Sequence, residues 1–191
     1  MAKLPGHRIR KDRKQTSLRP TVTAPLLDST GILKANMTSL FIVSGGQTGV
    51  DRGALDAALE ANSPCGGWCP EGRLAEDGTI PKRYPLTDLP GGYLQRTRKN
   101  VEDSDGTLIL TFGEATGGTA RTVEVCQRIG RPHLVIDASM TAMASAEQAA
   151  REFVRRYGIT RLNVAGPRAS KESRGYAYAH ELIAGLIRGE P

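Results

Sequence analysis

The sequence predicts an α/β fold in which a mainly parallel sheet lies between two layers of helices. Continuous apolar runs at residues 40–43 and 107–112 are typical of strands that are buried on both faces of a sheet. Segments with apolar residues at helical spacing follow these runs. Glycine-rich turns connect several of these pairs, so strands and helices alternate along the chain. Such alternation favours right-handed crossovers and a parallel sheet.

The first strand–turn–helix unit begins with the strand at 40–43. The helix after it is predicted at 49–60, because four apolar residues from Val50 to Ala58 fall on one helical face. Residues 61–95 are rich in glycine and proline, so we expect long loops there around short extended pieces. A short helix is predicted at 96–101.

Three further strand–helix units complete the predicted fold. Each combines an apolar run with a segment of helical periodicity, and the last helix carries an apolar stripe at positions i, i+3, i+4, i+7 and i+8. The predicted strands are 107–112, 133–137 and 161–166, and the predicted helices are 117–129, 145–157 and the segment with Ala179, Leu182, Ile183, Leu186 and Ile187.

The net charge of +6 comes from the N-terminal segment. Residues 1–38 hold eight basic and two acidic side chains, whereas the rest of the chain holds 18 of each. Because the segment lacks apolar periodicity, we expect a disordered basic extension at 1–38 and a single ligand-binding domain at 39–191. Met37 directly precedes the first predicted strand and is a candidate native start.

Several classes of function are disfavoured by composition. The balanced charge of residues 39–191 argues against a nucleic-acid-binding groove, despite a pI of about 9.5. No apolar run approaches the roughly 18 residues that cross a bilayer, and no secretory signal is visible. The three cysteines are too few for a disulfide framework. We therefore expect a cytoplasmic protein that binds neither nucleic acid nor membrane.

The strongest functional signal is the polar, glycine-rich turn at residues 44–54. In a parallel α/β sheet the turn after a strand lies at the edge where ligands bind. Glycines let the main chain approach a ligand, and a helix N-terminus attracts anions. The alternative is a tight turn in which Asp51 is merely a first-turn acid. The candidate ligand-binding residues here are Gly45, Gly46, Gln47, Thr48, Gly49, Asp51 and Arg52.

A second candidate anion-binding turn begins the helix at 117–129. We expect the two turns to share one crevice, which Asn163, Gly166 and Arg168 after the last strand are candidates to close. Neither turn has the ending of a Walker loop or the G-x-G-x-x-G pattern, which disfavours NTP hydrolysis and NAD binding. The candidates in this turn are Gly117, Gly118 and Thr119.

The segment between the two turns adds four candidates, each with a structural alternative. Trp68 is a candidate to stack on a flat ring, or it anchors its loop in the core. Arg73 is a candidate partner for phosphate. Arg96 and Asn100 are candidates for ligand contact, although exposed surface is the default for a basic segment.

No catalytic or metal-binding residue is assigned from the sequence. Cys65 and Cys69 have no second pair of Cys or His at metal spacing, so a zinc site is disfavoured. His7, His133 and His180 give no Ser–His–Asp or Cys–His arrangement that can be justified.

The motifs, taken in order, resemble the putative molybdenum carrier family over residues 40–176. The resemblance implies a Rossmann-like three-layer fold related to lysine-decarboxylase-like and nucleotide-sensing proteins, and a homo-oligomer, dimer or tetramer. By name it implies carriage of molybdenum cofactor, a pterin whose dithiolene holds the metal and which carries a phosphate. The matching motifs are SGGQTGVDR at 44–52, GGWCPEGR at 66–73, DSDGT at 103–107, GGT at 117–119 and LNVAGPR at 162–168.

The first hypothesis is therefore a binding or carrier protein for molybdenum cofactor or a related phosphorylated heterocycle. One alternative is a nucleotide-processing enzyme that resembles the related phosphoribohydrolases, with Glu71, Glu76 or Glu124 as acid or base. Their G-G-x-G-T-x-x-E motif is only partly met, because Ala120 and Arg121 replace its Gly-Thr. Another alternative is a sensor of a nucleotide-derived signal. Burial of Glu71 or Glu124 in a deep pocket beside the glycine-rich turns would favour catalysis, and a crevice lined only by N–H groups, Arg and Thr would favour carriage.

Overall fold

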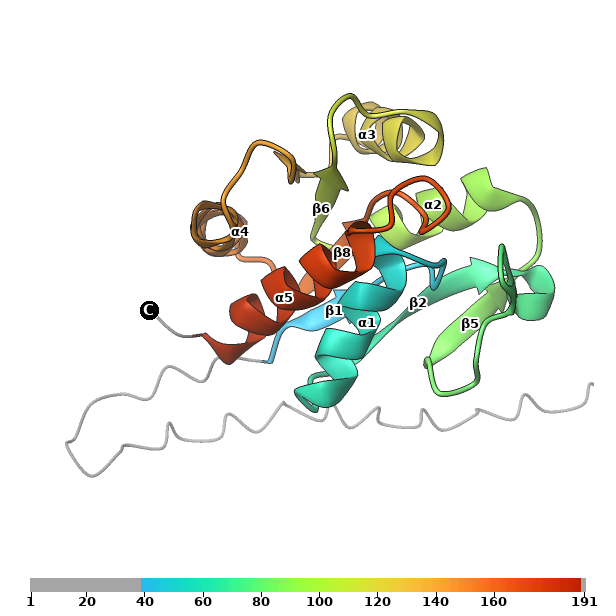
Figure 1. The fold of residues 1–191 in the computed structure, drawn as a ribbon. Helices are drawn as coiled ribbons and strands as arrows, with labels where there is room; N and C mark the ends of the chain where they lie inside the picture. Colours follow the sequence, from blue (N-terminus) through green and yellow to red (C-terminus); the bar gives the residue numbers. More distant parts are fainter. Residues whose placement is uncertain (1–38, 190–191) are drawn as a thin grey trace, which may run out of the picture. The chain divides into compact units, whose positions relative to one another are not determined.

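The computed structural model describes residues 39–189, and the extension expected at 1–38 lies outside them. A parallel sheet of six strands, in the order β5-β2-β1-β8-β6-β7, forms the middle of the fold (Figure 1). In chain order the strands are β1 (Phe41–Val43), β2 (Cys65–Pro70), β5 (Leu86–Leu89), β6 (Gly106–Thr111), β7 (His133–Asp137) and β8 (Arg161–Ala165).

Helices cover both faces of the sheet, which confirms the predicted Rossmann-like α/β fold. Figure 1 shows α1, α4 and α5 on one face and α2 and α3 on the other. This division agrees with the strand order, because right-handed crossovers that run in opposite directions along a sheet lie on opposite faces. The helices are α1 (Val50–Glu60), α2 (Tyr93–Glu102), α3 (Gly117–Ile129), α4 (Met143–Tyr157) and α5 (Gly175–Arg188).

The apolar core lies between the central strands and α1, α4 and α5. Ile42, Leu108 and Leu162 of the sheet have no exposed surface, and Leu182 and Ile183 of α5 are equally buried. Full burial of each such side chain is worth about 1.5–3 kcal/mol. The stripe predicted for the last helix therefore faces this core.

The register of the central strands brings three turns to one edge of the sheet. Ile42 of β1 is paired with Leu162 of β8, and Leu108 of β6 is paired with Val164. Because the strands are parallel, the turns that follow β1, β6 and β8 leave the sheet at the same edge. Ligands of open α/β sheets bind at this edge.

The short extended pieces expected within 61–95 include two strands of the main sheet. Both β2 and β5 lie in this segment and pair with each other, and β2 also pairs with β1. Glycine and proline are poor strand formers, so the strand character of β2 depends on these tertiary contacts. The connection between them holds a 3₁₀ turn at Glu71–Arg73 and an antiparallel hairpin of β3 (Leu74–Ala75) and β4 (Gly78–Thr79).

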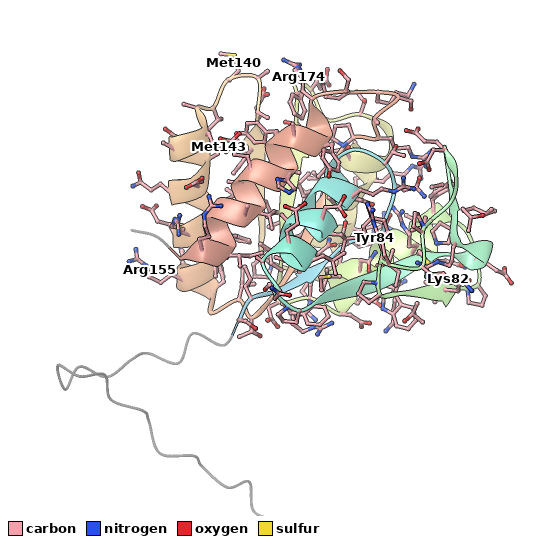
Figure 2. All side chains as sticks on the ribbon, turned by 60° about the horizontal axis from the view of Figure 1, so that its bottom comes forward. Lys82, Tyr84, Met140, Met143, Arg155 and Arg174 are labelled. Atoms are coloured by element: carbon pink, nitrogen blue, oxygen red, sulfur yellow. The ribbon has the colours of Figure 1, made fainter. Side chains whose placement is uncertain are left out.

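Hydrogen bonds to one buried carboxylate hold the segment before β5 against the helices. The hydroxyl of Tyr84, labelled in Figure 2, donates to Asp56 of α1 at 3.0 Å. Tyr176 of α5 donates to the same carboxylate oxygen at 2.9 Å. Partial desolvation of the Tyr176 hydroxyl and its bond to Asp56 raise its pKa to about 12, so it stays a donor at neutral pH.

Two helices begin earlier than the sequence pattern predicts. Helix α2 starts at Tyr93 instead of 96, and α4 starts at Met143 instead of 145. In residues 39–189 no helix is both long enough and apolar enough to cross a membrane.

Candidate functional site

A cavity of about 280 Å³ opens at the edge of the sheet where the strands end, and we call it the cleft. Four segments line it: the turn after β1 with the start of α1, the start of α2, the start of α3, and the loop after β8. The two glycine-rich turns of the sequence therefore do meet at one cavity. Gln47 and Asp51 of the first turn line this cavity, and so do Gly117, Gly118 and Thr119 of the second.

Positive charge dominates the lining of the cleft. Four cationic side chains line it, against one carboxylate, that of Asp51. Within residues 39–189, three of these cations form no salt bridge, and the fourth lies at the limit of one with Asp51. A small anion would gain most from this arrangement, because its charge offsets theirs in a site partly removed from water. The cations are Arg96, Arg121, Arg168 and Lys171.

Two buried side chains at the cleft carry polar atoms that have no hydrogen-bond partner among the described residues. Gln47 is 3% exposed; its Nε2 donates to the carbonyl of Leu74 at 2.9 Å, but its Oε1 accepts nothing. The Nε and Nη1 atoms of Arg96 are also buried, and neither donates a hydrogen bond to a described residue. A buried polar atom without a partner costs about 1–3 kcal/mol. Both residues line the cleft, so this unsatisfied acceptor and these two unsatisfied donors lie buried in its wall.

Asp51 is the buried acid of the site. It is 6% exposed, and burial raises the pKa of its carboxyl, although the Arg96 charge and the Gln47 main-chain N–H act to lower it. The N–H of Gln47 donates to Oδ2 of Asp51 at 3.2 Å, whereas Nη1 of Arg96 lies 3.9 Å from that oxygen. The carboxylate is thus held in place with its negative charge only partly compensated.

A small polar recess of about 20 Å³ adjoins the cleft, and Asp51 and Arg96 line both. This volume matches a single water molecule. Thr97, Asn100, Thr122 and Asn163 complete its polar lining. Asn163 therefore closes the crevice at the recess, and Gly166 and Arg168 close it at the cleft.

The start of α3 presents main-chain amides to the cleft. The first hydrogen bonds of this end are donated by Thr119 and Ala120 to the carbonyl of Thr116, at 3.1 and 3.3 Å. The N–H groups of Gly117 and Gly118 precede these bonds and are the free donors of a helix N-terminus. A β-carbon on Gly118 would meet no atom within 4 Å, so the fold itself does not require glycine there.

Tyr93 is the aromatic residue of the cleft, and the sequence analysis missed it. Its ring is 45% exposed and lies beneath two guanidinium groups, those of Arg168 at 4.5 Å and Arg96 at 5.6 Å from the ring centre. The neighbouring Leu94 also lines the cleft and is 48% exposed. An aromatic residue one turn before a basic helical segment was the available signal, and it was lost because the helix was predicted to begin too late.

Three glycines of the first turn shape the main chain rather than line the cleft. Gly45 lines the recess. Gly46 has a φ of +74°, and a β-carbon there would overlap Leu86 of the core beneath. A β-carbon on Gly49 would overlap the carbonyl oxygen of Pro167. Gly46 and Gly49 therefore allow close packing of the turn, whereas Gly117 and Gly118 face open space.

Thr48 and Arg52 tie the first turn to the hairpin. The hydroxyl of Thr48 donates to Glu76, and Arg52 donates to Asp77 through Nη2 at 2.8 Å. Glu76 also accepts the main-chain N–H of Ser170 at 3.1 Å, which connects the hairpin to the loop after β8. These bonds lower the pKa of Glu76, with the bond from the Ser170 side chain as the largest cause. Neither Thr48 nor Arg52 lines the cleft.

Trp68 and Arg73 occupy structural positions outside the cleft. The indole Nε1 of Trp68 donates to Asp103 at 2.7 Å. Asn100 accepts the main-chain N–H of Trp68 at 2.8 Å and donates to its carbonyl at 3.0 Å, which joins β2 to α2. Arg73 donates to four main-chain carbonyls between residues 80 and 86.

The three acids weighed for catalysis lie on the surface. Glu71, Glu76 and Glu124 are all exposed, and none lines the cleft. Among residues 39–189 there is also no group of three or more His, Cys, Asp or Glu placed to hold a metal ion. Asp51 is therefore the carboxylate that can take part in chemistry or recognition at this site.

Comparisons with known proteins agree with the geometry. A family model described as the circularly permutated YpsA SLOG family matches residues 42–187, which include all four segments of the cleft. The chain is similar to a solved structure, the "Putative molybdenum carrier protein" from Syntrophus aciditrophicus SB, at 41% sequence identity and a TM-score of 0.76. That similarity covers 78% of this chain and 95% of the other. No curated protein matches the chain.

Proposed function

The chain belongs to the circularly permutated YpsA SLOG family, and from this membership and the cleft we propose that it binds a small anionic molecule as a carrier or sensor. The proposed ligand is molybdenum cofactor or a related phosphorylated heterocycle. Its phosphate accepts hydrogen bonds from the main-chain amides of Gly117 and Gly118 and pairs with the cationic side chains of the cleft. Its ring contacts Tyr93. The related structure is described as a molybdenum carrier, which supports this choice.

One observation carries the proposal. The buried Oε1 of Gln47 and the buried Nε and Nη1 of Arg96 have no partner among the described residues, and both side chains line the same positively charged cavity. Polar groups buried without partners are rare in folded proteins, and a functional role or a bound water or ion is their usual explanation.

Molybdenum cofactor fits the residues present. A phosphate suits the cations and the start of α3, and a pterin ring suits contact with Tyr93, which is 45% exposed. When bound, the cofactor supplies the dithiolene that holds molybdenum, so the protein needs only to bind and orient it. The chain's own residues would hold the phosphate, cover the ring and leave the metal to its organic ligand.

We also propose that the protein forms a homo-oligomer in the cytoplasm. Val135 on the edge strand β7 is 44% exposed, and Met140 after it is 83% exposed and labelled in Figure 2. Exposed apolar side chains beside an open sheet edge are suited to contacts between subunits. Analytical ultracentrifugation tests this proposal, and a monomer at high concentration would contradict it.

The ligand proposal is tested on freshly purified protein. Native mass spectrometry with metal analysis shows whether a small molecule and molybdenum accompany the chain. Calorimetric titration with pterin phosphates and nucleotides then measures dissociation constants directly. We expect phosphorylated heterocycles to bind and their unphosphorylated forms to bind far more weakly. Equal affinity for both forms would contradict an anion-binding cleft.

A second candidate function is hydrolysis of a nucleotide, and the burial of Asp51 favours it. A carboxylate with a raised pKa beside a recess of one water's volume is suited to general base catalysis. The protein would be incubated with nucleoside monophosphates and the mixture separated by chromatography. Release of free base or free phosphate that Asp51→Asn abolishes would establish hydrolysis, and unchanged nucleotide would exclude it for those substrates.

A further inference from the structure

We propose that the cleft recognises the 2-amino-4-oxopyrimidine edge that guanine and pterins share, with Asp51 accepting its N–H groups and Arg96 donating to its carbonyl oxygen. This inference rests on the proposed function, because it names the part of the bound heterocycle that the cleft reads. It concerns the recognition edge alone and is independent of whether the ligand carries a metal.

The arrangement of acceptor and donor supports this choice. Oδ2 of Asp51 and Nη1 of Arg96 lie 3.9 Å apart, which is beyond hydrogen-bond distance, and both residues line the cleft. Each can therefore take a different group of one ligand. The shared edge offers two adjacent N–H donors followed by a carbonyl oxygen, so a carboxylate beside a guanidinium matches it.

Gln47 distinguishes this edge from other bases. Its buried Oε1 is an acceptor without a donor among the described residues, and it adds to the acceptors of Asp51. A ligand with several N–H donors would therefore suit these acceptors best. The ring N–H and the amino group of guanine or a pterin supply three, whereas the amino group of adenine supplies two and the ring N–H of hypoxanthine one. Xanthine has a carbonyl oxygen where guanine has the amino group. This oxygen is an acceptor with a partial negative charge, so the carboxylate of Asp51 would repel it.

The size of the cleft limits the rest of the ligand. Its volume of about 280 Å³ lies at the lower end of small-molecule sites, which span roughly 300–1,000 Å³. A nucleoside monophosphate or a pterin monophosphate suits this volume, and a dinucleotide exceeds it. We therefore expect one phosphorylated ring system in each cleft.

A series of ligands with the same sugar phosphate tests the edge without altering the protein. Dissociation constants would be measured by calorimetry for GMP, IMP, AMP and XMP, and for a pterin monophosphate. We expect GMP or the pterin monophosphate, or both, to bind at least about tenfold more tightly than IMP, with XMP the weakest. Whichever of the two binds more tightly identifies the source of the edge.

A variant then assigns the preference to Asp51. Asp51→Asn has the same shape and can still accept the N–H of Gln47, but it loses the charge and one acceptor. We expect it to bind GMP and IMP with nearly equal affinity, while Glu124→Gln, on the exposed side of α3, keeps the wild-type preference. Circular dichroism checks that both variants are folded.

The outcomes separate this inference from the proposed function. If the wild-type protein binds GMP, IMP and XMP with equal affinity, the cleft does not recognise the base edge and the inference is wrong. The proposal that the cleft binds anions would be unaffected. If Asp51→Asn is folded and keeps the preference, Asp51 does not read the edge. If none of the five ligands binds, both the inference and the proposed function fail.

Discussion

Oδ2 of Asp51 and Nη1 of Arg96 face one cleft from two different helices, 3.9 Å apart. Asp51 lies in the first turn of α1, and Arg96 lies in α2 on the opposite face of the sheet. Only the closed fold brings the two together. Because they do not hydrogen-bond to each other, each can bond a different group of one ligand.

The preference for GMP over IMP should depend on pH. Burial raises the pKa of Asp51 above its ordinary value, against the charges of Arg96 and Arg168 and the N–H of Gln47. The ionised carboxylate accepts N–H donors and the protonated form does so poorly, so the preference is present above the raised pKa and lost as pH falls through it. The phosphates of the two ligands titrate alike, so the ratio of their dissociation constants isolates Asp51. Calorimetry at a series of pH values measures it, and a ratio that grows on acidification would contradict this assignment.

Arg96→Gln should weaken the binding of GMP, IMP and the pterin monophosphate, whose ring carbonyl we assign to Arg96. The substitution removes a buried charge and donors that have no partner among the described residues. Hydrogen bonds to charged groups contribute about 1.5–3 kcal/mol, which corresponds to about 10- to 100-fold in the dissociation constant. Arg98→Gln is the matched control, because Arg98 lies on the same helix in an exposed pair with Glu102. Similar losses in both variants would show a general charge effect instead of a specific contact.

Gly118→Leu should block the cleft without unfolding the protein. The added side chain meets open space in the folded chain but lies beside the amides that we assign to phosphate. We expect the dissociation constant to rise roughly tenfold or more, while the free energy of unfolding changes by less than about 1 kcal/mol. Gly92→Leu, at another open glycine that does not line the cleft, is the control. Unchanged affinity in Gly118→Leu would remove the start of α3 from the site.

Trp68 and Tyr93 should respond to substitution in opposite ways. Trp68→Phe loses the hydrogen bond to Asp103 and should cost about 1–3 kcal/mol of stability with little change in affinity. Tyr93→Ala removes an exposed ring and should leave stability nearly unchanged, but weaken binding of heterocycles about 3- to 10-fold. Chemical denaturation and calorimetry on the two variants give both quantities. The reverse pattern would restore Trp68 as the residue that stacks on the ligand.

Much of the architecture was predictable because its strands and helices carry local signals. The apolar runs of β1, β6 and β8 mark buried strands, a further apolar run marks the edge strand β7, and the helices between them have clear periodicity. Strand β2 carries no such signal: its sequence, CGGWCP, becomes a strand because β1 and β5 pair with it on both sides. Tertiary contacts, rather than local preference, decide such a segment.

The site was predictable in outline but not in its individual contacts. Parallel strands bring the turns after β1 and β6 to one edge, so their meeting followed from the pattern of elements. Which of Trp68 and Tyr93 faces the ligand depends on the direction in which each side chain leaves its element. The burial of Asp51 likewise depends on α2, a helix of the other layer, so no local feature of the turn reveals it.

Arg73 holds residues 73–86 together, and opening of this segment affects the shape of the cleft. The guanidinium of Arg73 donates hydrogen bonds to the main-chain carbonyls of Ile80, Pro81, Tyr84 and Leu86. Residues 73–86 should therefore open together, and their amides should exchange with solvent at a common rate. Such an opening would also release Gln47 from Leu74 and Thr48 from Glu76. The time for which the pocket keeps its shape is thus limited by a segment that contributes no atom to its walls.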